Sequence, residues 1–129
     1  MRWLIAYGTL RSPEVVEALL GHSVPARPAT LDGWYPAELV GRDYPVLLHD
    51  PAARCEIDLV GPISDAEHQL VTEWEDTFYV TAEWTVDGVT GTVFLPVLDH
   101  PDLPELGGVW SYERFRERDL PTRLAHMWA

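Results

Sequence analysis

The chain has 129 residues, of which 47% are apolar and 11% aromatic, a composition typical of a folded domain and not of a disordered segment. Acidic residues outnumber basic ones by 21 to 9, the net charge is −12, and every basic residue is an arginine. No large basic patch can form, so we expect neither nucleic acid nor a membrane surface as a partner. We interpret residues 1–129 as a single domain.

The single cysteine, Cys55, leaves no internal disulfide and is compatible with a reducing compartment. The first residues lack the pattern of a secretory signal, and no apolar run reaches the ~20 residues that a membrane-spanning helix needs. We therefore expect a cytoplasmic protein.

The first elements are a strand, a glycine turn and a helix start. The apolar run at residues 3–6 indicates a buried strand or a piece of core helix, and Gly8 interrupts it. Ser12 suits the N-cap and Pro13 the first turn of a helix over Pro13–Leu20. This arrangement directs several backbone N–H groups toward one point, which suits a carboxylate or phosphate. A strand-to-helix connection without a ligand is the simpler alternative, and the segment alone favours it.

Prolines and glycines divide the next part of the chain into short pieces. The elements expected there are a strand at 29–34, a turn at Tyr44, a short strand at 45–48, a turn at 50–53, and an alternating, half-buried strand at 55–60 that Gly61-Pro62 ends.

A capping box begins the second helix, because Glu67 follows Ser64 by three residues. The helix should extend to about Glu75. Its apolar stripe is formed by Leu70, Val71 and Trp74. Glu75 falls on the border of that stripe and should be partly buried, whereas Glu73 points away from it and should be solvated.

A β-hairpin follows, with alternating strands at 79–86 and 89–97 joined by Asp87-Gly88. The expected register places Val86 opposite Val89, Trp84 opposite Gly91, Ala82 opposite Val93 and Val80 opposite Leu95. Gly91 would leave room for the Trp84 indole.

The C-terminal part begins with a surface loop at 98–108. Ser111 should cap a helix that contacts the core through Phe115 and stops at Pro121. A last helical turn at 122–129 would pack through Leu124, Met127 and Trp128. Helices and strands together predict an α+β fold, with a small mixed β-barrel and helices packed outside it.

Most catalytic chemistries lack support in the sequence. No two of the five histidines have a metal-ligand spacing on a helix, so we expect no metal site. Cys55 has no sequence cue for a lowered pKa, and no G-x-S-x-G motif supports serine catalysis. Glu75 is the stronger candidate for a catalytic residue, because burial beside Trp74 would raise its pKa toward that of a general acid or base. The alternative is a solvated glutamate in a run of acids, and the residues alone favour that alternative.

Three segments of the chain resemble a known family, and this resemblance favours the catalytic interpretation of Glu75. Tyr7-Gly8-Thr9-Leu10, placed after a strand and before a short helix, resembles the gamma-glutamylcyclotransferase-like family, also called the AIG2-like family. Tyr44-Pro45-Val46 is similar to the family's Tyr-Pro segment. Residues 71–79, with Glu75 after an aromatic residue and Tyr79 further on, are similar to its acidic segment. The resemblance covers roughly the whole chain.

The resemblance implies a small barrel with one cavity and an enzyme that needs no metal or other cofactor. Its partner would be a small γ-glutamyl substrate, and its products 5-oxoproline and a free amine. Glu75 matches the catalytic glutamate and would act as general acid and base. The turn at residues 7–10 would hold the substrate carboxylate. The substrate-binding residues implied are Tyr7, Gly8, Thr9, Leu10, Tyr44, Pro45 and Tyr79.

Two departures from the family pattern leave alternatives open. Asp76 stands where relatives usually have glycine, and Phe94 stands where many have tyrosine. Asp76 would either raise the pKa of Glu75 further or crowd the cavity. A carboxylate-binding module without chemistry is therefore a second hypothesis, and an acidic interaction surface for a basic partner is a third. The leaving amine and the oligomeric state are not readable from the sequence.

Overall fold

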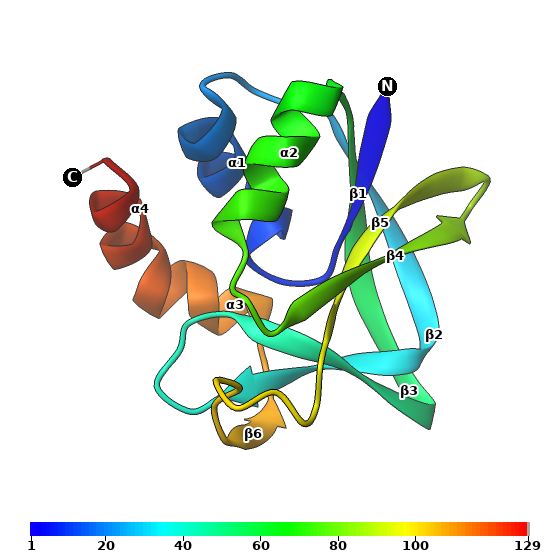
Figure 1. The fold of residues 1–129 in the computed structure, drawn as a ribbon, viewed down its shortest axis with the longest axis vertical. Helices are drawn as coiled ribbons and strands as arrows, with labels where there is room; N and C mark the ends of the chain where they lie inside the picture. The colour runs from blue at the N-terminus through cyan, green and yellow to red at the C-terminus, as the bar shows by residue number, and fades with distance from the viewer. Residues whose placement is uncertain (129) are drawn as a thin grey trace.

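In the computed structural model, which describes residues 1–128 and the side chains of residues 1–127, a curved mixed sheet is covered by helices gathered on one side (Figure 1). The strands are β1 (Arg2–Ala6), β2 (Ala26–Leu39), β3 (Pro45–Ile63), β4 (Tyr79–Val86), β5 (Val89–Pro96) and β6 (Leu106–Val109). The helical elements are η1 (Thr9–Arg11), α1 (Pro13–Leu20), α2 (Asp65–Trp74), α3 (Tyr112–Arg114), η2 (Phe115–Asp119) and α4 (Leu120–Trp128).

The strand order is β4-β5-β1-β3-β2-β6, and within the described residues the β1–β5 pair is parallel while the other pairs are antiparallel. The predicted α+β class is confirmed. The sheet has β4 and β6 as its two edges and is not closed, so "barrel" describes it only loosely.

The predicted strand–turn–helix at the N-terminus is confirmed. β1 lies in the middle of the sheet, between β3 and β5, which explains its unbroken apolar run. The Ser12 hydroxyl accepts a hydrogen bond from the backbone N–H of Val15 at 3.2 Å and caps α1. Gly21, with φ of 83°, ends the helix in the left-handed region.

β2 and β3 form a longer antiparallel pair than the prolines and glycines suggested. The predicted turn at 50–53 is wrong: these residues form a bulge within β3, since Asp32 pairs with Arg54 but Trp34 pairs with His49. The strand does not end at Gly61-Pro62 either, because Ile63 still pairs with Arg2. Proline has no backbone N–H to donate to a neighbouring strand. Pro62 is tolerated in β3 because the β1–β3 ladder shifts register beside it, so no ladder hydrogen bond is required from this position.

α2 has the predicted capping box. Ser64 Oγ accepts from Glu67 N–H, and the Glu67 carboxylate accepts from Ser64 N–H. Val71 is fully buried and Trp74 packs against the main core, but Leu70 is 43% exposed, so the predicted apolar stripe is narrower than expected.

The hairpin has the predicted register from Val80–Leu95 to Val86–Val89. The reason given for Gly91 is wrong. A Cβ at Gly91 would lie 3.0 Å from the carbonyl oxygen of Trp3, so glycine is needed for the approach of β1 and not for the Trp84 indole.

The C-terminal part differs most from expectation. β6 overlaps the end of the predicted loop and pairs with β2. Pro121 does not stop the helix, because η2 is a π turn in which Leu120 N–H donates to the Phe115 carbonyl, and α4 continues through the proline. A widened turn relieves the clash that proline makes with the preceding turn. Phe115, Leu124 and Met127 pack into the core as predicted, whereas the Trp128 side chain and Ala129 lie outside the described residues.

Among the described residues, no helix combines the length and the apolar character that crossing a bilayer would require.

Candidate functional site

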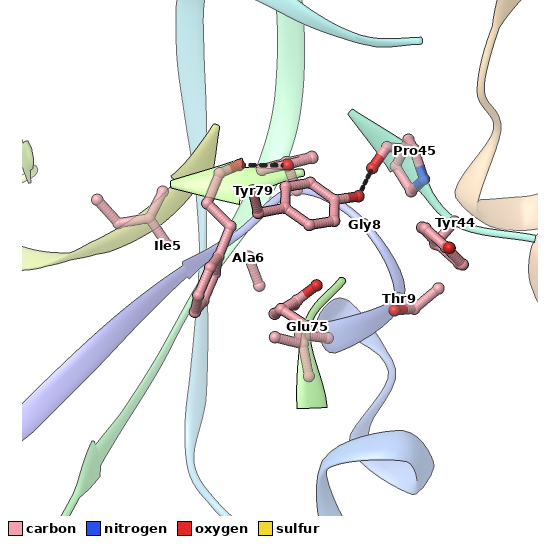
Figure 2. A pocket seen from close by; sticks show the side chains of 11 residues that line it. Ile5, Ala6, Gly8, Thr9, Tyr44, Pro45, Glu75 and Tyr79 are labelled. Atoms are coloured by element: carbon pink, nitrogen blue, oxygen red, sulfur yellow. Dashed lines mark hydrogen bonds between the residues drawn. The ribbon is translucent and has the colours of Figure 1, made fainter. Parts of the chain in front are cut away.

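One cavity lies where the end of β1, η1, the loop before β3, the end of α2 and the hairpin meet (Figure 2). Its empty volume is about 330 Å³, including the open mouth. Every residue that the sequence predicted for the site lines it, together with three further residues. The lining consists of Ile5, Ala6, Tyr7, Gly8, Thr9, Leu10, Tyr44, Pro45, Glu75, Tyr79 and Phe94.

The turn after β1 forms one wall. Its first hydrogen bond runs from Arg11 N–H to the Gly8 carbonyl, so the N–H groups of residues 8–10 have no partner within the turn. A Cβ at Gly8 would lie 2.8 Å from Pro45 Cδ, which is closer than side-chain packing allows. Glycine is therefore required for the turn to pack against Pro45, and that packing fixes the direction of the free amides.

Glu75 lies opposite this turn. It is the C-cap of α2, and its N–H still donates to the Val71 carbonyl at 3.2 Å. The side chain is half-buried, and Figure 2 shows it beneath the Tyr79 ring and near Thr9. Removal from water, with a smaller contribution from the negative charge of Asp76, raises the pKa of Glu75 to about 8. A carboxyl in this range gives and takes protons near neutral pH.

Two tyrosines hold the cavity walls together. Tyr79 donates its hydroxyl hydrogen to the Pro45 carbonyl at 2.6 Å, and Tyr7 donates to the Phe94 carbonyl at 2.5 Å. Burial, and then neighbouring groups that include Glu75, raise the pKa of both phenols well above the ordinary value. Both tyrosines are therefore neutral at physiological pH. As hydrogen-bond donors, Tyr7 joins the turn after β1 to β5, and Tyr79 joins β4 to the start of β3.

Three charged residues gather around Tyr44 at one side of the cavity, and sequence reasoning pointed to only one of them, Asp76. Tyr44 donates to the Asp76 carboxylate, and burial together with this acid raises the pKa of Tyr44 to about 12. Asp76 is exposed and does not line the cavity, so it does not crowd it. Asp43 and Arg123 form an ion pair beside Tyr44, with Arg123 Nε 2.9 Å from Asp43 Oδ2. Residues 80 positions apart gave no local signal of this pair.

The site offers acid–base and hydrogen-bonding groups. In the part of the chain that the structure describes, no group of three or more His, Cys, Asp or Glu side chains is placed to hold a metal ion. Its chemical resources are a carboxyl with a raised pKa and free backbone amides suited to an anion, because the phenol hydrogens of Tyr7, Tyr44 and Tyr79 are already donated to protein acceptors.

The chain belongs to the family described as gamma-glutamyl cyclotransferase, AIG2-like, whose profile matches residues 4–116. It is 32% identical to AIG2-like protein C of Arabidopsis thaliana over 120 residues, a match that spans 90% of this chain and 70% of the relative. The segment that matches the profile contains the whole cavity lining.

Solved structures show the same fold. The solution structure of an Arabidopsis thaliana protein superposes with a TM-score of 0.66 at 23% identity, covering 97% of this chain and 78% of that one. The crystal structure of an uncharacterized protein from Pyrococcus horikoshii gives a TM-score of 0.65 at 16% identity, covering 98% of this chain and 99% of the other.

Proposed function

We propose that this chain is a cyclotransferase that converts a γ-glutamyl amine or γ-glutamyl amino acid into 5-oxoproline and a free amine. The observation that carries the proposal is the shared cavity: Glu75, with its pKa of about 8, lines the same cavity as residues 8–10, whose amides have no partner within the turn. Family membership supports the reaction class.

The substrate would bind through its glutamyl end. Its α-carboxylate would accept hydrogen bonds from the amides of the turn, the arrangement that anions adopt at such turns. This contact folds the glutamyl chain so that its own α-nitrogen approaches its γ-carbonyl carbon. Both reacting groups come from one molecule, so holding that geometry supplies a large part of the rate, and no cofactor is required.

Glu75 would move the protons. The ionised carboxylate removes one proton from the α-ammonium group, and the freed amine attacks the γ-carbonyl carbon to form the new C–N bond. The tetrahedral intermediate then breaks its bond to the leaving nitrogen, and the Glu75 carboxyl returns the proton to that nitrogen. The attack leaves two hydrogens on the new ring nitrogen, and the second of them also passes through Glu75 to the leaving amine. The α-nitrogen has then lost two protons, the leaving nitrogen has gained two and departs as an ammonium group, and Glu75 ends as it began. An N–H of the turn would stabilise the developing oxyanion.

The remaining wall residues have supporting roles in the proposal. Tyr79 fixes the Pro45 carbonyl, and Pro45 in turn packs against Gly8, so the two sides of the cavity are joined. Phe94 contributes a ring and its carbonyl, which is occupied by Tyr7. A side-chain hydrogen bond that a tyrosine at position 94 would give to the substrate is absent, and the carboxylate must therefore depend more on the turn.

The test is to incubate the protein with a panel of γ-glutamyl dipeptides and γ-glutamyl amines and to detect 5-oxoproline by mass spectrometry. The wild type should release it from at least one compound. Glu75→Gln should lose the activity, whereas Glu73→Gln, which changes an exposed acid on the same helix, should keep it. Thermal stabilisation by a γ-glutamyl compound without product would instead support the binding module. Equal activity in Glu75→Gln and wild type would remove Glu75 from the mechanism.

A further inference from the structure

Arg123 comes from a part of the chain that the family profile does not cover. The profile ends at residue 116, and α4 begins at Leu120. α4 nevertheless reaches the cavity wall, because it places the Arg123 guanidinium against Tyr44 and beside Asp43 in the loop before β3. Arg123 donates two hydrogen bonds to the Asp43 carboxylate, from Nε to Oδ2 at 2.9 Å and from Nη2 to Oδ1. Only 22% of the Arg123 side chain and 21% of the Asp43 side chain are exposed, so the pair is largely shielded from water.

The same guanidinium lies over two aromatic rings from two other elements. It is 5.7 Å from the centroid of Tyr44 and 5.9 Å from the centroid of Trp74. Both distances fall within the range of a cation–π interaction. Tyr44 lines the cavity, and Trp74 is the last residue of α2, directly before Glu75. Arg123 thus connects α4, the loop before β3 and the end of α2 at one point.

Charge adds to this geometry. The groups around Glu75 are Asp76 on its own segment, the neutral phenols Tyr7, Tyr44 and Tyr79 from three other segments, and Arg123 from α4. Burial and Asp76 raise the pKa of Glu75, whereas the positive charge of Arg123 lowers it. Arg123 therefore favours the ionised form of Glu75, whereas burial and the charge of Asp76 favour the protonated form more strongly.

We propose that Arg123 is a positioning residue of this site: held by Asp43, it fixes the Tyr44 wall and the Trp74-Glu75 end of α2 and supplies a positive charge to the surroundings of the acid. The consequence for catalysis rests on the proposed function. The structural consequence does not, because the environment of Glu75 and Tyr44 is measurable without a substrate.

The experiment compares the wild type with Arg123→Gln and Arg123→Lys. Arg118→Gln is the matched control, since it removes the same charge from an exposed side chain on the preceding helical turns. Carboxyl 13C NMR titration follows the pKa of Glu75, and ring 1H–13C spectra follow Tyr44. Thermal melting reports folding. The kcat/KM for 5-oxoproline release is measured against pH on any substrate that the wild type turns over.

Arg123→Gln should raise the pKa of Glu75 and shift the Tyr44 ring signals. Its kcat/KM at pH 7 should fall roughly threefold to tenfold, with a smaller loss at pH 9, because fewer molecules carry the ionised base at neutral pH. Arg123→Lys should keep the pKa of Glu75 near the wild-type value but still shift the Tyr44 signals, since an ammonium keeps the charge and loses the planar two-point contact with Asp43. Arg118→Gln should change none of these.

The proposal is overturned if folded Arg123→Gln leaves the Glu75 titration and the Tyr44 signals at their wild-type positions, or if Arg118→Gln moves them equally. Failure of the proposed function looks different: no panel compound yields 5-oxoproline with the wild type, while the NMR changes in Arg123→Gln remain.

Discussion

Gly8→Ala tests how the turn after β1, which we propose to hold the substrate carboxylate, is built. The added Cβ would lie 2.8 Å from Pro45 Cδ and 3.0 Å from Pro45 Cγ, and the proline ring cannot rotate away as a flexible side chain would. Pro45 is also held by the hydrogen bond from Tyr79 to its carbonyl. Either the turn or the start of β3 must therefore move, and both line the cavity.

The magnitude follows from the size of this overlap. Forcing one extra methyl group into a packed contact costs about 1–3 kcal/mol, and the lower entropy of alanine in the unfolded chain returns about 0.4–1 kcal/mol. A net loss of about 1–2 kcal/mol corresponds to a fall in Tm of roughly 3–10 °C for a domain of this size. Because the amides of the turn move as well, kcat/KM for 5-oxoproline release should fall roughly 100-fold.

The assay pairs differential scanning calorimetry with 5-oxoproline release, and Gly108→Ala is the matched control. Gly108 lies in β6, and a Cβ there would meet no atom within 4 Å. The control should keep its Tm and its activity. If Gly8→Ala has the stability and activity of the control, the close approach to Pro45 does not shape the turn, and the reasoning is refuted.

Three further predictions concern single groups. Tyr79→Phe removes the hydrogen bond to the Pro45 carbonyl while keeping the ring, and should lower the free energy of unfolding by about 1–2 kcal/mol in urea denaturation; an unchanged midpoint would show that the bond does not hold the wall. The pKa of Glu75 is raised from 4.5 to about 8 in the folded state, so its ionisation opposes folding, and stability should fall as pH rises from about 4.5 to 8. Glu75→Gln should remove that fall, and the same slope in the variant would contradict the raised pKa. The pKa shift of Glu14 has the opposite sign, because its hydrogen-bonded ion pair with Arg116 lowers the pKa to about 2 in the folded state. The stability that the pair supplies is therefore complete above about pH 4.5 and is lost as the pH falls toward 2. Arg116→Gln should flatten that acid limb of Tm against pH, and a limb identical to that of the wild type would count against the pair.

Local patterns predicted the elements whose geometry is set by their own residues. The caps of α1 and α2 and the hairpin register follow from Ser12, Ser64 and Asp87-Gly88, and the structure confirms all three. Glu75 was placed at the edge of an apolar stripe by helix geometry alone, and the structure puts it half-buried at the end of α2.

Features that depend on distant partners were not predictable in this way. The bulge at 50–53 exists because β2 supplies a continuous neighbour across it, and β6 exists because β2 offers a free edge. Pro121 indicates a helix end on its own, and only the π turn before it allows α4 to continue. The Asp43–Arg123 pair joins residues with no common local pattern, so no periodicity or spacing could reveal it.

The candidate site was predictable in part: less than the caps and the hairpin, but more than the features that depend on distant partners. Composition and periodicity indicated neither the cavity nor its occupant, and the segments at 7–10, 44–46 and 71–79 became informative only together, through a family resemblance. The structure brings these segments into one cavity.

The central claim is that Glu75 acts as the acid and base of the site, and the pH dependence of kcat/KM for 5-oxoproline release tests it most directly. The account predicts a rate that rises with pH along a limb centred near 8, the pKa of Glu75, and a limb that disappears with the activity in Glu75→Gln. A rate limb centred near the ordinary glutamate pKa of 4.5, or a limb near 8 that persists in Glu75→Gln, would contradict the account.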